Sequence, residues 1–154
     1  MYFTILALHS LVRWLVVAGL FFAIFRAYSG LLSKRNFTRF DNSVRHWTTT
    51  IVHIELIFGL WLYFISPVVD YFLHHFKEAV HQQEIRFFGM EHSIMMIVAI
   101  IIITIGSARA KRKQTDREKF KTIAVWFTIG LLIILMFIPW PFSPFAGRPL
   151  FRPF

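Results

Sequence analysis

Six ionisable side chains stand inside apolar stretches of this chain and are the first candidates for chemistry. They are His9, Arg13, His53, Glu55, Glu91 and His92. A charged or protonatable group is costly in a hydrophobic segment, so such groups are rare there and tend to mark a functional interior. Imidazole nitrogens bind metals and haem iron, and a nearby carboxylate orients a ligating imidazole. These residue types predict a cofactor, metal or proton site.

The composition places these groups in a membrane. Of 154 residues, 56% are hydrophobic and 16% are charged, against about a quarter charged in soluble domains. A soluble domain of this size could not bury so much apolar surface. The net charge of +9 comes from cations in short loops, which suits anionic lipid and argues against nucleic acid as a partner. The absence of cysteine excludes thiolate metal sites and covalently attached haem.

Four apolar stretches have the length of a transmembrane helix, about 20 residues. They cover about residues 2–25, 47–69, 87–106 and 120–140. The fold expected is an all-α, integral membrane four-helix up-down bundle that forms one domain over residues 1–154. The tail, residues 141–154, is rich in proline and aromatic residues and should not form a regular helix.

The cations predict the orientation in the membrane. Residues 26–46 hold five Lys and Arg and residues 107–122 hold seven, whereas the remaining loop and tail hold Lys77, Arg86, Arg148 and Arg152. Cytoplasmic loops are enriched in Lys and Arg. Both basic loops are therefore expected in the cytoplasm, with the N and C termini on the outer, periplasmic side.

His9 and His92 should share a level in the bundle. They lie about 10 Å and 8 Å below the outer surface, at 1.5 Å per residue. Their helices, the first and third, face each other diagonally in an up-down bundle. Two such imidazoles predict a b-type haem. Glu91 would orient a ligating imidazole from the second layer, and Arg86 and Arg148 could meet the propionates. Helix-to-helix hydrogen bonds, or a metal without porphyrin, remain alternatives, and His53 is the alternative ligand.

Arg13 and Glu55 should form a buried ion pair. Their depths, about 16 Å and 18 Å, agree within error. Neither charge is stable alone near the midplane. The alternative is that Arg13 meets Glu91 or a haem propionate.

A weaker metal candidate lies in the outer loop. His74, Glu78 and His81 have i, i+4, i+7 spacing and would share one face of a continuous helix, where they could bind zinc or copper. The alternative is a solvated polar helix face.

Several motifs resemble a known family. They are Leu8-His9-Ser10-Leu11-Val12-Arg13-Trp14, His53 to Tyr63, Met90-Glu91-His92-Ser93 and Ile138-Pro139-Trp140. Together they resemble small bacterial four-helix membrane proteins labelled cytochrome b-like. The resemblance implies a four-helix membrane bundle with haem b.

We therefore expect a b-type haem protein of the bacterial inner membrane. It would exchange electrons between a quinol and another membrane partner, as a subunit or accessory of a respiratory complex, and need not be an enzyme by itself. The rivals are a haem-free assembly protein and a proton- or ion-conducting bundle that uses Arg13, Glu55 and the histidines.

Overall fold

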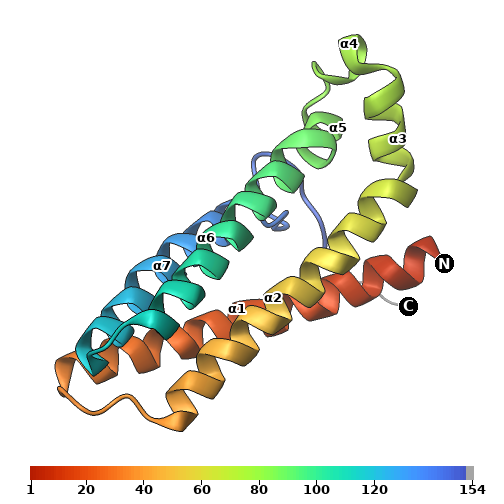
Figure 1. Ribbon diagram of the computed structural model, residues 1–154. Coiled ribbons are helices and arrows are strands. Elements are labelled where there is room, and N and C mark those ends of the chain that lie inside the picture. The colour runs from red at the N-terminus through yellow and green to blue at the C-terminus, as the bar shows by residue number, and fades with distance from the viewer. Residues whose placement is uncertain (152–154) are drawn as a thin grey trace.

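The computed structural model describes residues 1–151 and is helical in that range, without strands (Figure 1). The long helices are α1 (Tyr2–Leu32), α2 (Arg39–Ile65), α6 (His92–Arg112) and α7 (Asp116–Phe137). The short ones are α3 (Pro67–His74), α4 (Phe76–Ala79), α5 (Gln83–Arg86) and the π-helical segment η1 (Phe87–Glu91). The all-α expectation is confirmed. Arg152 and the rest of the expected tail beyond residue 151 lie outside the described residues.

Four helical segments are long and apolar enough to cross a membrane, as expected. They are Tyr2–Leu32, Arg39–Ile65, Gln83–Arg112 and Asp116–Phe137. Much of their apolar surface faces outward, including Phe25, Ile57 and Leu132. A lipid bilayer is the solvent that suits such a surface.

The helices extend beyond the apolar stretches that predicted them. The Thr38 and Thr115 side chains each accept a hydrogen bond from the backbone N–H three residues on. The carboxylates of Asp41 and Glu118, at those positions, accept in return from the backbone N–H of the threonines. These capping boxes start α2 and α7 earlier than the apolar residues do. At its other end α2 stops before Pro67, because the residue before a proline is driven out of the helical region.

The apolar core is built mainly by α1, α6 and α7, and Val52 is the only member of the main buried cluster from α2. α1 packs along α2 and α7, while α6 packs along α7 and, less extensively, α2. Gly106 and Gly130 allow α6 and α7 to approach closely: an added Cβ would lie 2.2 Å from Trp126 and 2.4 Å from Ile103. α2 therefore contributes least to the buried core, although it packs along α1.

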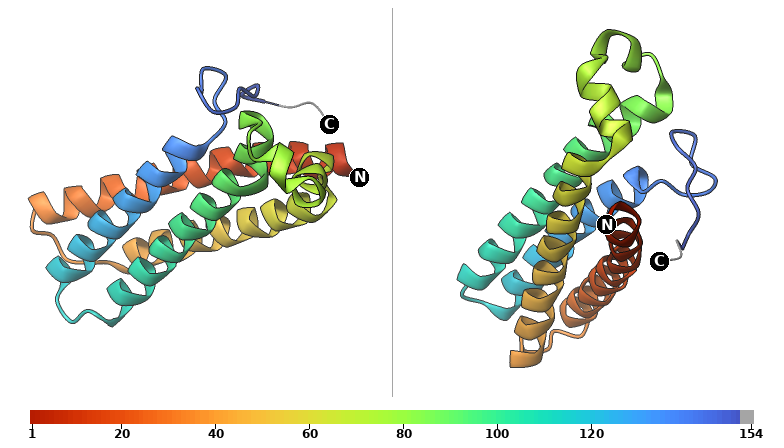
Figure 2. Two further views of the ribbon diagram at one scale, coloured as in Figure 1. Left: turned by 90° about the horizontal axis from the view of Figure 1, so that it is seen from above. Right: turned by 90° about the vertical axis from the view of Figure 1, so that its right-hand side faces the viewer.

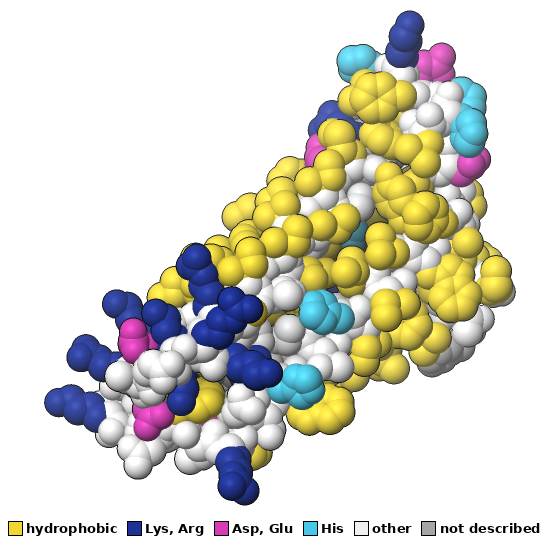
Figure 3. All heavy atoms as spheres, in the orientation of Figure 1, with side chains coloured by type: hydrophobic (Ala, Val, Ile, Leu, Met, Phe, Trp, Pro, Cys, Tyr) yellow, Lys and Arg dark blue, Asp and Glu magenta, His cyan; other side chains and the backbone are white. Residues whose placement is uncertain are grey.

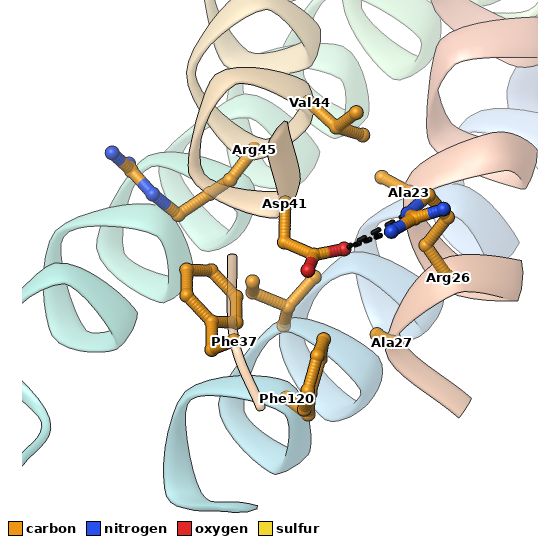
Figure 4. Close-up of a pocket in the computed structure, with 9 residues that line it drawn as sticks. Ala23, Arg26, Ala27, Phe37, Asp41, Val44, Arg45 and Phe120 are labelled. Atoms are coloured by element: carbon orange, nitrogen blue, oxygen red, sulfur yellow. Dashed lines mark hydrogen bonds and ion pairs between the residues drawn. The ribbon is translucent and has the colours of Figure 1, made fainter. Parts of the chain in front are cut away.

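Asp41, in the first turn of α2, binds Arg26 of α1 (Figure 4) and Arg35 of the connection between the two helices. Its buried carboxylate lies 2.8 Å from Nη2 of Arg26 and 2.7 Å from Nη1 of Arg35. The hydrogen bond with Asp41 raises the pKa of the Arg35 guanidinium, so this pair is held in its charged form. Arg45, on the next turn, donates to the backbone of Ser107 and so ties α2 to α6.

The opposite end of the molecule carries the short helices and the tail (Figure 2). The tail is held by hydrogen bonds to α5 and α1. Gln83 donates to the Pro144 carbonyl, Arg148 pairs with Glu84, and the Leu150 carbonyl accepts from Trp14 at 3.1 Å. Residues 138–151 contain no regular helix, as the prolines predicted.

Candidate functional site

A large cavity lies between the helices on the side of the short helices and the tail. Its volume is about 750 Å³, within the range of roughly 300–1,000 Å³ typical of cofactor and ligand pockets. Most of its wall is apolar, from α1, α2, α3, α6 and the tail. The polar side chains on the wall include His9, Ser10, Arg13, Glu55, Tyr63 and His92. Four of the six groups singled out in the sequence therefore line one cavity.

His9 on α1 and His92 on α6 face each other. Their ring centroids are 6.5 Å apart and the ring planes are nearly perpendicular, at 88°. Two imidazoles that share one metal, each nitrogen about 2 Å from it, have centroids roughly 6 Å apart. The observed separation fits a shared metal and also fits an ordinary edge-to-face ring contact.

The Nδ1 atom of each histidine lies against a protein oxygen. His92 Nδ1 is 2.8 Å from the carbonyl of Phe137, to which it can donate. His9 Nδ1 is 3.1 Å from Oε1 of Glu55, although the angle is not that of a hydrogen bond. A ligating histidine commonly engages a carbonyl or a carboxylate through its second nitrogen. In both rings Nε2 is therefore the nitrogen left for a ligand.

The π-helical segment η1 sets the rotation of His92. A π turn inserts an extra residue and turns the following side chains relative to those before it; such turns are frequent at functional sites. Gly89 makes the segment possible, because an added Cβ would lie 2.3 Å from Cγ of Phe72 on α3. The Tyr63 hydroxyl donates to the Gly89 carbonyl at 3.0 Å. Contacts from α2 and α3 thus fix the segment that leads into α6.

Arg13 and Glu55 line the same cavity, but Glu55 contacts His9 rather than Arg13. Arg13 donates through Nη2 to the Leu150 carbonyl at 2.7 Å and to Ser10 Oγ at 3.3 Å. The expected Arg13–Glu55 pair is therefore not the contact that the structure shows. The depths agreed with a pair, but the tail returns along α1 and supplies a carbonyl to the guanidinium.

Glu91 is directed to Arg86, not to its neighbour His92. Arg86 Nε lies 2.6 Å from Glu91 Oε1. The His92 ring contacts the Phe137 carbonyl, so the expected contact between Glu91 and this ring is not the one that the structure shows. Arg148 lines the cavity and its guanidinium lies 4.8 Å from the Phe88 ring centroid, so this cation is near enough to serve an anionic group there.

His53 stands apart from the cavity. It is exposed on α2, and its Nε2 is 2.9 Å from Oγ1 of Thr104 on α6. It cannot serve as the alternative ligand to His9 or His92 in this arrangement, because it is not on the cavity wall.

The outer-loop metal candidate is not assembled. The helix breaks at His75, between α3 and α4, so His74, Glu78 and His81 do not share a face. His74 instead lies 3.2 Å from Asp70. Within residues 1–151, no cluster of three or more His, Cys, Asp or Glu side chains is arranged to hold a metal ion.

Sequence reasoning missed Tyr63, Gly89 and the carbonyls of Phe137 and Leu150. Gly89 gave a signal, since it directly precedes Met90-Glu91-His92 in an otherwise bulky segment. The carbonyls gave none, because every residue has one.

Comparison with known proteins gives no relative to reason from: no family model, curated protein or solved structure matches the chain. The site must therefore be interpreted from its own geometry.

Proposed function

We propose that this protein is a b-type haem protein of the membrane that takes part in respiratory electron transfer, in which His9 and His92 would hold the haem. One observation carries the proposal. Two imidazoles face each other across a large apolar cavity at 6.5 Å, and each has its Nδ1 beside a protein oxygen. Haem b needs such a pair of nitrogens and an apolar wrap around its macrocycle.

The chain's own residues have distinct parts in this proposal. His9 and His92 would hold the iron through Nε2. Phe137 fixes the His92 ring by its carbonyl, and Glu55 lies beside the His9 ring. Apolar side chains exclude water. Arg148, which pairs with Glu84, and Arg13 are the cations on the cavity wall that would meet a propionate. Haem, when bound, supplies one-electron transfer. The proposal agrees with the resemblance to cytochrome b-like proteins.

The placement in the cell is part of the same proposal. The protein is an up-down bundle in the bacterial inner membrane, with both termini and the cavity toward the periplasm. The basic connections 33–38 and 113–115 face the cytoplasm, in agreement with the Lys and Arg bias. A small bundle of this kind would serve as a subunit or accessory of a larger respiratory complex, with a quinol as one electron partner.

A visible absorption spectrum tests the haem directly. Protein purified in mild detergent from its native membrane should show a sharp band on reduction with dithionite, at about one haem per chain. The pyridine haemochrome assay gives the amount. A protein that is fully folded by circular dichroism and yet shows no visible band contradicts the proposal.

A second candidate function is that of a haem-free assembly protein. The hydrogen bond between His92 and the Phe137 carbonyl favours it, because this bond joins α6 to α7 without any cofactor. The same 6.5 Å ring contact would then be packing between helices. In that case, replacing His92 lowers stability and removes no cofactor.

A further inference from the structure

The cavity has a side opening between α2 and α6. Side chains from both helices line the cavity and are also exposed on the outside of the molecule: Leu60 and Phe64 on α2, Ile94 and Ile97 on α6. Figure 3 shows a hollow between these helices, rimmed by hydrophobic side chains. The seam between α2 and α6 is packed less extensively than the contact between α6 and α7, and the main buried cluster contains only one residue of α2.

The end of the cavity toward the termini is covered. Val69 and Phe72 of α3 are buried on its wall, and Arg148 and Pro149 bring the tail against it. Hydrogen bonds from Gln83, Arg13 and Trp14 hold that tail in place. The exposed apolar rim is therefore the natural entrance, and in a membrane this rim faces hydrocarbon.

Glu55 is a polar side chain on the cavity wall inside this entrance. Its Oε1 faces His9, while its buried Oε2 has no hydrogen-bond partner among residues 1–151. A buried acceptor without a donor is costly, so it is suited to a ligand that donates a hydrogen bond. Glu55 is ten residues before the end of α2, about 15 Å along the helix, and so lies near the middle of the bilayer.

We propose that the seam between α2 and α6 admits a quinol from the bilayer, with one hydroxyl donating to Glu55 Oε2. The apolar tail of the quinol would leave between Leu60 and Ile97 into the lipid. This assignment rests on the proposed electron-transfer function for the identity of the ligand. A phospholipid fits less well, because its charged head group would have to descend to mid-bilayer depth.

Photolabelling in phosphatidylcholine nanodiscs tests the site. The probe is an azido-quinol analogue, and decylubiquinol is the competitor. We expect competed labelling in the peptides of α2 and α6 that contain Leu60 and Ile97. The double variant Leu60→Trp/Ile97→Trp should lower that labelling by about tenfold or more, because the added rings fill the entrance.

Ile57→Trp/Ile101→Trp is the matched control. These side chains lie on the same helices and are exposed to 60% and 50%, against 41% and 40% for Leu60 and Ile97, but they are not on the cavity wall. The control should label like the wild type. Equal labelling of the two double variants overturns the proposal. So does competition by a short-chain phosphatidylcholine that matches decylubiquinol.

The visible spectrum of each sample keeps this test separate from that of the haem. Haem with no competed labelling refutes the quinol site alone. Competed labelling without haem supports the quinol site and refutes the haem proposal.

Discussion

At the scale of single residues, the account depends on what surrounds two histidines. His9 and His92 are far apart in the sequence and meet in one cavity, each with a protein oxygen at Nδ1. His53 has the same chemistry but bonds to Thr104 away from the cavity. Position, and not residue type, separates a candidate ligand from a histidine that only joins two helices.

Replacing either cavity histidine should remove the cofactor. We expect His9→Ala and His92→Ala each to lose most of the haem, because iron with one axial ligand is held less strongly. His53→Ala is the control and should retain it. The amount of haem per chain, measured after purification, shows whether these histidines bind it. Full haem content in both cavity variants would assign the ligands elsewhere.

Gly89 should be intolerant of even one methyl group. In Gly89→Ala the new Cβ meets Phe72 near its ring attachment, at 2.3 Å, where the side chain cannot move aside. Overpacking of this kind costs about 1–3 kcal/mol and should displace His92. We expect a lower melting temperature and reduced haem content.

Two further variants make that test specific. The Gly89→Ala/Phe72→Ala double variant should lose less stability than the sum of the two single variants, since the obstructing ring is gone. Gly19→Ala should be harmless, because its Cβ would lie 3.6 Å from the nearest atom, Oγ1 of Thr48. A Gly89→Ala protein with wild-type stability would show that η1 is not under this constraint.

At the scale of helices, the sequence predicted the number and the type of the long helices better than it predicted their rotation about their own axes. Four apolar stretches of membrane length predicted four spans, and the Thr38–Asp41 and Thr115–Glu118 spacings could have set two of the starts. Rotation was beyond reach, because the π turn at Phe87–Glu91 turns His92 toward Phe137 and away from Glu91. The Arg13–Glu55 pair failed for a similar reason: depth along a helix can be counted, whereas the path of an irregular tail cannot.

The Asp41 contacts should be the main electrostatic tie between α1 and α2. Asp41→Asn removes the charge that two arginines share, and we expect a loss of roughly 2 kcal/mol or more, since both guanidiniums are partly desolvated. Thermal unfolding in detergent measures it. Glu118→Gln, in the exposed capping box of α7, should have a much smaller effect. Similar melting temperatures for the two variants would contradict this role.

At the scale of the whole molecule, charge and cavity lie at opposite ends. Residues 26–46 and 107–122, which are the two connections with the adjoining helix ends, carry twelve of the cations. The cavity opens between helices toward the other end. If the positive-inside rule holds, a periplasmic alkaline phosphatase fused after Phe154 should be active. A cytoplasmic reporter fused there should be silent. The opposite pattern of reporter activity would contradict the orientation and place the cavity on the cytoplasmic side.

Electron paramagnetic resonance of the oxidised protein tests the central claim most directly, since it reports the ligands of the iron. Two imidazoles that hold one haem iron would make that iron low-spin. We therefore expect a low-spin haem signal in the wild type that is absent from both His9→Ala and His92→Ala. A haem signal that is high-spin in the wild type, or low-spin and unchanged in either variant, would contradict it.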